Sequence, residues 1–590
     1  MDHSNRNTAL ASALCEELAR CGVERAVICP GSRSTPLALA LLREPSVATT
    51  SVVDERSGGF FALGAANATR RPVVVVCTSG TAAANLHPAV AEADEASVPL
   101  IVLTSDRPPE LRGVGAGQTI DQVKLYGSAV RWFCEMGTHE ANDEGLIHMR
   151  SSACRAYASA AGDPRPGPVH LNLSWRDPLG PEARDGEVTA TSELALTGRG
   201  ELPLTDLHRP AAALGGPQLD SIAADLAEAE RGLIVAGRQH DPGLGRAIAA
   251  LAEATGFPIL AEPTSQLRFG THDRRNVVWA YEAILRAPSE SLAPELVVRF
   301  GDLPTSKALR GWLAGLDDCL QLVVDPWGTW SEPTRKAALL LRAEPAALAD
   351  AVTDRLEMPV KSSDFRDRWL EAGRAAGEAV TVGVSRLNGL GTLTEPGAHT
   401  ALGEAYSDGD LVYTASSMPI RDQESFAAGS EAAVRFLSNR GANGIDGTVS
   451  SAVGAAVASG RAAWIVLGDL ALHHDSNGLA LLRHVDTPVR IVCLNNDGGG
   501  IFEFLPQAEQ VDRAEFEAIF GTPLGLDLAK LAELYGVEHR RVERIEELAE
   551  PVAGHVLFQV KVERGSNVAL HRGLWERAAE AARQALGPAT

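Results

Sequence analysis

The stretch from Gly468 to Leu505 constrains the fold most strongly, because it reads as strand, helix and strand in close succession. The apolar run RAAWIVLGD leads into Asp469, and the run VRIVCLNN leads into Asn496. Between them, HDSNGLALLRHV carries apolar residues at helical spacing. This β-α-β pattern predicts that Asp469 and Asn496 lie at the carboxyl ends of neighbouring parallel strands, where open α/β sheets bind ligands.

The residue types at these two strand ends predict a metal site. A carboxylate, an amide oxygen and the carbonyls of a Gly-rich turn suit Mg²⁺, a hard cation that prefers oxygen ligands and often shares them with phosphates. Such a site would clamp a diphosphate. Taken alone, the pattern leaves ordinary loop chemistry as an equally good interpretation.

Composition limits the classes of protein that the chain can belong to. Its 590 residues are 45% hydrophobic and 22% charged, which predicts a globular protein of roughly three or four domains. The net charge of −22 argues against nucleic acid and anionic membranes as partners. The eight cysteines form no CxxC pair, so neither a zinc site nor a disulfide framework is indicated. Without a signal-peptide core or a bilayer-spanning apolar run, we predict a cytoplasmic protein with no membrane insertion.

The chain divides into three α/β blocks in which buried strands alternate with amphipathic helices. The first block covers residues 1–185, and residues 186–215 lack sustained periodicity and read as a linker. The second, 216–355, has no GxGxxG after a strand and is interpreted as a spacer domain that helps to shape the site. The third, 356–590, contains the Asp469 motif. The predicted fold class is α/β, with parallel sheets in three domains.

Basic residues lie in loops beside several predicted strands. In AVICPGSRSTPLALALL, Thr35 is expected to cap a helix with Pro36 at its first position, so Arg33 stands beside a helix N-terminus that attracts anions. Similar Gly- or Ser-rich loops hold Arg107, Gln118, Lys307, Ser417, Arg421 and Arg440. A lone surface arginine is usually solvated. Five basic residues in such turns on an acidic chain indicate pockets for anionic substrates.

The motifs as a set closely resemble one family. GD followed by NN resembles the metal-diphosphate motif of thiamine-diphosphate enzymes. Together with PGSRSTPL, DERSGGFFALG, SDRPPELRGVGAGQTID, SMPIRD and SNRGANGIDG, it resembles the 2-succinyl-5-enolpyruvyl-6-hydroxy-3-cyclohexene-1-carboxylate synthases of menaquinone biosynthesis. The resemblance runs through the first and third blocks and reaches the second at Lys307. It implies a pyruvate-oxidase-like architecture with pyrimidine-binding, middle and diphosphate/metal-binding domains, in that order.

The resemblance also implies an activity. This family of transferases decarboxylates 2-oxoglutarate on thiamine diphosphate, with Mg²⁺ or Mn²⁺, and adds the succinyl carbanion to isochorismate. Two dicarboxylates must then meet in one pocket, which would explain the many Arg and Lys side chains. The family further implies a homodimer with shared active sites, and the sequence leaves open whether dimers assemble into a tetramer.

Carried over by motif, Glu55 at a strand-to-helix junction serves the cofactor's aminopyrimidine ring, and the small residues after it permit close approach of a flat ring. Asp469, Asn496 and the Gly498 carbonyl hold the metal, and Ile445 supports the bent cofactor. The implied cofactor-binding set is Glu55, Ser417, Arg440, Ile445, Gly468, Asp469, Asn496 and Ile501. The catalytic set is Glu55, Arg33, Gln118, Lys307, Ser417 and Arg421. Substrate contacts fall to Arg33, Arg107, Gln118, Lys307, Ser417, Arg421 and Arg440, with Ile501, Phe502 and Leu505 as an apolar wall.

Two departures and two alternatives remain at this stage. Ala415-Ser416 stands where the family often has Gly-Asn, and Asp497 stands where Asn is also common. Another thiamine enzyme, such as an acetohydroxyacid synthase or a 2-keto-acid decarboxylase, would not need so many cationic side chains. A non-catalytic metabolite-binding protein on the same fold would be favoured by loss of Glu55 or of the Asp469–Asn496 pair, and both are present.

Overall fold

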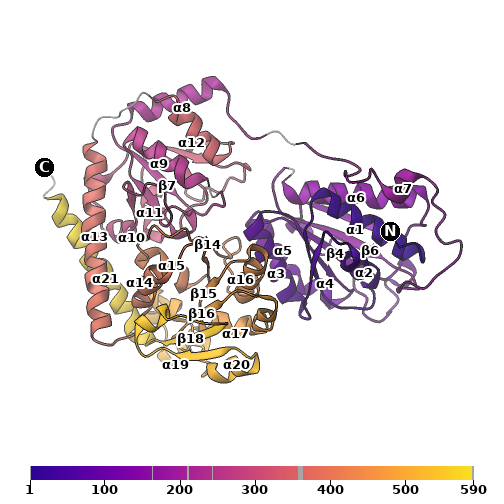
Figure 1. Ribbon diagram of the computed structural model, residues 1–590. Coiled ribbons are helices and arrows are strands. Elements are labelled where there is room, and N and C mark those ends of the chain that lie inside the picture. The colour runs from indigo at the N-terminus through magenta and orange to yellow at the C-terminus, as the bar shows by residue number, and fades with distance from the viewer. Residues whose placement is uncertain (1, 163, 209–210, 242, 357–362, 588–590) are drawn as a thin grey trace. The chain divides into compact units, whose positions relative to one another are not determined.

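The computed structural model describes residues 2–162, 164–208, 211–241, 243–356 and 363–587 (Figure 1). These residues contain three six-stranded sheets whose strand pairs are parallel, with helices between the strands, so the predicted α/β fold class is confirmed. The predicted domain boundaries remain predictions. Residues 209–210 of the predicted linker and 357–362 of the predicted third domain lie outside the described residues.

The chain forms two compact units. The first comprises residues 1–209, 439–463 and 471–487, and the second comprises residues 210–438, 464–470 and 488–590. None of the described helices combines the length and the apolarity that a membrane crossing requires.

The sheet of the first unit has the strand order β2-β1-β3-β4-β6-β5. Its strands are β1 (Arg25–Ile28), β2 (Ala48–Ser51), β3 (Val73–Cys77), β4 (Leu100–Asp106), β5 (Trp132–Gly137) and β6 (Pro168–Ser174). Every residue of β3, β4 and β6 is buried, and β3 (VVVVC) accordingly reads as an unbroken apolar run. The helices are α1 (Arg6–Cys21), α2 (Thr35–Arg43), α3 (Glu55–Thr69), α4 (Thr81–Asn85), α5 (His87–Glu95), α6 (Asp143–Ala161), α7 (Glu193–Thr197) and α16 (Thr448–Ser459).

Helices α3 and α16 pack closely within this unit, as Figure 1 shows. Two glycines make the close approach possible. A Cβ atom at Gly64 would collide with the backbone of Ser451, and one at Gly454 would collide with the backbone of Phe61. The first turn of α3, which begins at Glu55, is therefore anchored by a tight helix pair.

The second unit contains two sheets. The first has the order β12-β11-β10-β7-β8-β9 and consists of β7 (Gly232–Ala236), β8 (Ile259–Ala261), β9 (Val277–Val278), β10 (Leu296–Phe300), β11 (Leu320–Val324) and β12 (Ala337–Leu341). Its helices are α8 (Gly216–Glu228), α9 (Leu244–Thr255), α10 (Tyr281–Ile284), α11 (Lys307–Ala314), α12 (Pro345–Thr353) and α13 (Asp364–Gly389). Ser306 caps α11 by accepting a hydrogen bond from the Leu309 amide, which places Lys307 at the start of that helix.

The other sheet has the order β14-β13-β15-β16-β18-β17 and consists of β13 (Leu411–Thr414), β14 (Arg435–Leu437), β15 (Ala463–Gly468), β16 (Val489–Asn495), β17 (Glu538–Arg541) and β18 (Val556–Lys561). Its helices are α14 (Glu395–Ala405), α15 (Met418–Phe426), α17 (Asp469–His474), α18 (Gln507–Gln510), α19 (Arg513–Phe516), α20 (Leu528–Leu534) and α21 (Arg564–Leu586). The long helices α13 and α21 run side by side (Figure 1) and share an apolar core that includes Trp369 and Leu574.

Two local predictions are corrected by the structure. The helix expected across 474–485 is split, because α17 ends at His474 and a 3-10 helix covers Ser476–His484. The residue that caps α2 is Ser34 rather than Thr35, which is already helical. In both places the apolar spacing locates a helix correctly but does not fix its ends.

Candidate active site

Arg33 follows β1 at the carboxyl edge of the first sheet. Its Nη1 donates a hydrogen bond to the Trp175 carbonyl at 2.9 Å and lies 3.5 Å from a carboxylate oxygen of Asp177. Burial lowers the pKa of Arg33, and the positive charge of Arg107 lowers it further. Two guanidinium groups are thus held close enough to repel each other, and a bound carboxylate would stabilise both.

Arg107 and Gln118 meet around Ser79. Arg107 Nη1 donates to Ser79 Oγ at 3.0 Å, and Gln118 Nε2 donates to the Ser79 carbonyl at 3.1 Å. Ser79 Oγ in turn donates to the Gln118 carbonyl at 2.8 Å. Gln118 has a φ of +57°, a conformation that costs free energy in a non-glycine residue and that often marks a functional loop. The structure therefore brings together Arg33, Arg107 and Gln118.

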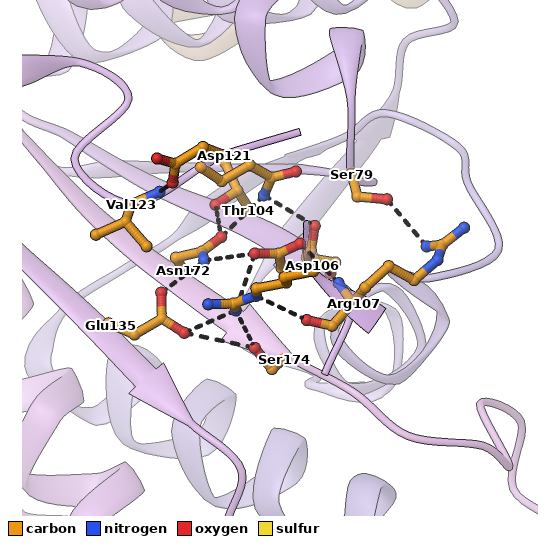
Figure 2. Close-up of polar contacts among 12 residues, drawn as sticks. Ser79, Thr104, Asp106, Arg107, Asp121, Val123, Glu135, Asn172 and Ser174 are labelled. Carbon is orange, nitrogen blue, oxygen red and sulfur yellow. Dashed lines mark hydrogen bonds and ion pairs between the residues drawn. The ribbon is translucent and has the colours of Figure 1, made fainter. Parts of the chain in front are cut away.

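A buried polar network next to Arg107 supports its backbone (Figure 2). Asp106, the last residue of β4, is fully buried and accepts hydrogen bonds from the Arg107 amide (2.7 Å) and from Asn172 Nδ2 (2.9 Å). Arg112 Nη2 lies 2.9 Å from the same Asp106 carboxylate and donates to Glu135 at 2.9 Å. Because each partner is itself hydrogen-bonded, the backbone at Arg107 is firmly positioned.

Glu55 is the first residue of α3 and is half-buried. Asp54 caps the helix, and its carboxylate also accepts a hydrogen bond from Asn477 Nδ2 at 2.9 Å. On the other side, Arg56 Nη2 donates to the His474 carbonyl at 2.8 Å. Asp54 and Arg56 are thus both hydrogen-bonded, whereas no described residue donates a hydrogen bond to the Glu55 carboxylate. The Glu55 carboxylate can therefore accept a proton from a ligand.

The glycines after Glu55 have a different role from the predicted one. A Cβ atom at Gly58 would lie 2.7 Å from Cys29 Sγ, and one at Gly59 would lie 2.9 Å from Ala89 Cβ. These glycines let α3 pack against β1 and α5 rather than against a flat ring. The sequence correctly indicates that the small residues allow a close approach, but in the structure the elements that approach these two glycines are β1 and α5.

Arg440 and Ile445 lie in the segment 439–447, which belongs to the first unit. Glu92 on α5 accepts hydrogen bonds from the backbone amides of Gly441 and Ala442, both at 2.7 Å. Ile445 is half-buried, and its carbonyl accepts a hydrogen bond from Thr448 Oγ1. A buried carboxylate thus fixes the loop that carries both predicted cofactor residues.

In the second unit, the third sheet brings Asp469 and Asn496 together after the adjacent strands β15 and β16, with Gly468 ending β15. Asp469 is only 2% exposed. The pKa of Asp469 is raised to about 6, chiefly by burial and also by the charge of Asp497, although hydrogen bonds from the backbone amides of Gly498 and Asn496 favour the ionised form. The Oδ1 atoms of Asp469 and Asn496 are buried, and no described residue donates a hydrogen bond to either. Two buried oxygens without donors fit a divalent cation.

The turn after Asn496 depends on its glycines and on Asp497. Gly498 has a φ of +141°, and a Cβ atom there would collide with the Gly521 carbonyl. The Gly498 carbonyl accepts a hydrogen bond from the Gly500 amide at 3.0 Å and keeps a second lone pair. Asp497 Oδ1 accepts hydrogen bonds from the amides of residues 524 and 525 at 3.1 and 2.9 Å. The Asp497 departure therefore anchors a neighbouring loop.

A buried network behind Asn496 has no counterpart in the sequence predictions. Asn496 Nδ2 donates to Glu395 Oε1 at 2.9 Å, and Asn567 Nδ2 donates to Glu395 Oε2 at 2.7 Å. His571 contacts the Asn567 carbonyl at 2.8 Å and Asp422 Oδ1 at 2.9 Å. Burial raises the pKa of Glu395 to about 7, with Asp422 raising it further. These polar residues lie on helices that are remote from the motifs in sequence. Apart from the TEPG at the start of α14, nothing in the sequence pointed to them.

A cavity of about 350 Å³ lies in the second unit. Its lining includes Lys307 and Arg421 from the predicted substrate residues and Ile501 and Leu505 from the predicted apolar wall. Phe504 also lines it, whereas the ring of Phe502 packs on that of Phe520 with centroids 5.4 Å apart. The lining residues that sequence reasoning missed are Glu282, Arg286, Thr305, Ser306, Arg310, Met418, Glu424, Ser425, Phe504, Arg572 and Trp575.

The cavity carries an excess of positive charge. Arg286 pairs with Glu282 at 2.8 Å, but Lys307, Arg310, Arg421 and Arg572 form no ion pair with described residues. Arg421 Nη1 donates to the carbonyl of Ser417, which has a φ of +77°. Burial lowers the pKa of Arg421, and Arg310 lowers it further. This cavity is suited to an anion with more than one carboxylate.

Comparison with known proteins agrees with the fold. The model of the N-terminal TPP binding domain of thiamine pyrophosphate enzymes matches residues 8–125, and the model of the C-terminal TPP binding domain matches residues 427–557. The chain is therefore a thiamine pyrophosphate enzyme by class.

Several relatives match nearly the whole chain. The 2-succinyl-5-enolpyruvyl-6-hydroxy-3-cyclohexene-1-carboxylate synthase of Myxococcus xanthus is 42% identical over 98% of this chain and 98% of its own length. The synthases of the same name from Geobacillus kaustophilus (42% identical; 96% and 97% covered) and Halobacterium salinarum (44% identical; 93% of each) are similar. The chain belongs to this synthase family, and the predicted family is confirmed.

Proposed function

We propose that this enzyme decarboxylates 2-oxoglutarate and transfers the remaining succinyl unit to isochorismate, in menaquinone biosynthesis, with thiamine diphosphate and Mg²⁺ or Mn²⁺. The observation that carries this proposal is the cavity with four cationic side chains that form no ion pair with described residues. Two residues of its lining, Ile501 and Leu505, closely follow Asn496 along the chain. Both substrates carry two carboxylates, and burying an unpaired carboxylate is costly. An excess of cations in the pocket offsets that cost.

Each group of residues has a role in this reaction. When bound, thiamine diphosphate supplies the nucleophilic carbon and the electron sink that decarboxylation requires. Glu55 holds and returns a proton at the ring nitrogen of the aminopyrimidine, which is general acid–base work. Asp469, Asn496 and the Gly498 carbonyl would hold the metal, which would neutralise the charge of the diphosphate. Ser417, Arg440, Ile445 and Ile501 would contact the cofactor.

The cationic residues bind and orient the substrates. Arg421 and Lys307 are assigned to carboxylates in the cavity of the second unit, where Ser417 is held by the Arg421 hydrogen bond. Arg33, Arg107 and Gln118 form the second carboxylate-binding group. Bidentate guanidinium–carboxylate pairs fix orientation as well as charge, which suits a reaction that must align two dicarboxylates.

The assembly follows from the family. We infer a homodimer in which each active site combines Glu55 of one chain with Asp469 of the other, and a cytoplasmic location. Mixing Glu55→Gln with Asp469→Ala protein tests the shared site. Heterodimers should regain one intact site, and the absence of rescue after verified subunit exchange counts against it.

Release of CO₂ from 2-oxoglutarate, measured with and without isochorismate, tests the reaction. The expected result is metal- and cofactor-dependent CO₂ release that rises when isochorismate is present, together with a product that contains both carbon skeletons. Pyruvate lacks the distal carboxylate and should be a poor donor. Equal use of pyruvate and 2-oxoglutarate would move the assignment to an acetohydroxyacid synthase-like enzyme.

A further inference from the structure

The buried carboxylate of Glu395 lies directly behind the metal-type oxygen pair. Glu395 is the first residue of α14, is 1% exposed, and follows Thr394, which caps the helix. A negative charge is favoured at a helix N-terminus, which helps to keep a carboxylate in this buried position. Its two oxygens accept hydrogen bonds from two different asparagines, Asn496 on one side and Asn567 on the other.

This arrangement decides which end of the Asn496 amide faces the metal site. An asparagine side chain has one acceptor end and one donor end. In the contact with Glu395 at 2.9 Å, the Nδ2 end of Asn496 donates and the carboxylate oxygen accepts. The Oδ1 end is then turned away from Glu395, and it is the end that receives no hydrogen bond from any described residue.

Gly500 leaves the space in which this amide lies. A Cβ atom at position 500 would lie 2.5 Å from Asn496 Nδ2, and Gly500 does not have a positive φ. The glycine is therefore required by the position of the Asn496 amide rather than by its own backbone conformation. The Glu395 carboxylate and the space left by Gly500 thus favour the same orientation of the Asn496 side chain.

We propose that Glu395 is a positioning residue for the metal site, which fixes the Asn496 amide so that Oδ1 is the atom offered to the divalent cation. This inference rests on the proposed function, because it takes Asn496 as a metal ligand. Partners that orient a metal ligand through its second polar atom typically change metal affinity about 10–100-fold when they are replaced.

A second metal ion at Glu395 itself is the competing interpretation. Ligand atoms of Glu395, Asp422 and His571 lie within 4.8 Å of one another and all three residues are buried. A cation there would have to displace the hydrogen bond between His571 and Asp422, and each Glu395 oxygen already accepts a hydrogen bond from an asparagine. The geometry therefore favours a hydrogen-bonded support for Asn496.

Reversing the polarity of the contact tests the proposal. In Glu395→Gln, the amide cannot accept hydrogen bonds from both asparagines. When Asn567 keeps its hydrogen bond to position 395, the glutamine NH₂ donates to position 496, which turns Asn496 so that its NH₂ group faces the cation. In the double variant Glu395→Gln/Asn496→Asp, the glutamine donates to one carboxylate oxygen and the other oxygen faces the metal. The double variant should therefore recover what Glu395→Gln loses, which a merely structural role for Glu395 does not predict.

The readout is Mn²⁺ affinity, measured by electron paramagnetic resonance of free Mn²⁺ in the presence of saturating thiamine diphosphate. Glu395→Gln should weaken Mn²⁺ binding about 10–100-fold, and the double variant should bind close to the wild-type affinity. Asp410→Asn is the matched control, since Asp410 is also a buried carboxylate of this unit but accepts its hydrogen bond from Trp464 Nε1. It should bind Mn²⁺ like the wild type.

Wild-type Mn²⁺ affinity in Glu395→Gln, or a double variant no better than Glu395→Gln, would overturn the proposal. If Glu395→Gln does not fold, Gly500→Ala moves the same amide without removing the carboxylate and should also weaken Mn²⁺ binding. Unchanged affinity in Gly500→Ala would then overturn it. Failure of the wild-type protein to bind Mn²⁺ would instead contradict the proposed metal site, so the two failures are distinguishable.

Discussion

Two aspartates at matching positions in different sheets show how this protein separates support from ligand binding. Asp106 ends β4 of the first sheet, and Asp469 directly follows β15 of the third, each in a central strand of a parallel sheet. Both side chains are buried, at 0% and 2% exposure. Asp106 has hydrogen-bond partners on both carboxylate oxygens, whereas no described residue donates to Oδ1 of Asp469.

The difference identifies the role of each carboxylate. A buried carboxylate with all its partners is part of a rigid network, and here that network holds Arg107 in place. A buried carboxylate with an unpartnered oxygen destabilises the protein by itself and is retained where a ligand supplies the missing partner. Burial raises the pKa of Asp469 to about 6. Equal burial therefore does not mean equal function.

Glu55 extends the comparison to a third carboxylate, and its replacement has the largest expected effect. In Glu55→Gln, an amide fills the same space but cannot exchange a proton with the aminopyrimidine ring. Turnover should fall about 10²–10⁴-fold while the affinity for thiamine diphosphate changes little. Steady-state kinetics together with calorimetry checks both parts, and near wild-type turnover would refute the catalytic role of Glu55.

The cavity arginine gives the next largest effect. Arg421→Ala removes a cation that forms no ion pair with described residues, so loss of a substrate carboxylate contact should cost about 2–5 kcal/mol. The kcat/KM for 2-oxoglutarate should fall by well over tenfold at unchanged cofactor affinity. Arg246→Ala is the control, because Arg246 lies in the same unit in an exposed ion pair with Asp350 and should keep wild-type kinetics. Equal kinetics in both variants would count against the cavity as the substrate site.

Replacement of the two aspartates should also have different effects on the stability of the protein. Asp106→Asn should lower the free energy of unfolding by about 1–3 kcal/mol, because an amide has one acceptor end and cannot accept from both the Arg107 amide and Asn172. Asp469→Asn should instead raise the free energy of unfolding of the metal-free protein at pH 7–8. Denaturant titrations of both variants check the opposite signs, and a shared sign would break the comparison.

The difference in the free energy of unfolding between the wild type and Asp469→Asn depends on pH through the pKa of Asp469. The folded-state pKa of about 6 lies above the unfolded value of about 3.9, so the folded state binds the extra proton between these values. The wild type therefore loses stability relative to the variant as pH rises toward 6, and the difference is complete above that pH. Below about pH 4 the two proteins should converge.

The sequence predicts the part of the site that lies in loops at strand ends. Strand-end placement followed from apolar runs ending at Asp469, Asn496 and Arg107, and parallel sheets bring such ends to one edge. The predicted helix ends were less accurate. The helix expected across 474–485 is a 3-10 helix over Ser476–His484 that follows α17, and apolar periodicity does not encode where an α-helix ends and a 3-10 helix begins.

The supporting residues could not be predicted in the same way. Glu395, Asn567 and His571 lie on α14 and α21, far from Asn496 in sequence, and only the packing of those helices brings them to it. Arg310 and Arg572 likewise reach the cavity from helix surfaces, where a basic residue is normally solvated. Contacts of this kind depend on tertiary packing, which spacing along one chain does not contain.

Calorimetric titration of thiamine diphosphate into the metal-free protein, with and without Mg²⁺, tests most directly the claim that Asp469 binds a ligand while Asp106 supports the fold. The wild type and Asp106→Asn should bind the cofactor only when Mg²⁺ is present, whereas Asp469→Asn should lose this Mg²⁺-dependent binding. Undiminished Mg²⁺-dependent affinity in Asp469→Asn, or its loss in a folded Asp106→Asn, would contradict the account.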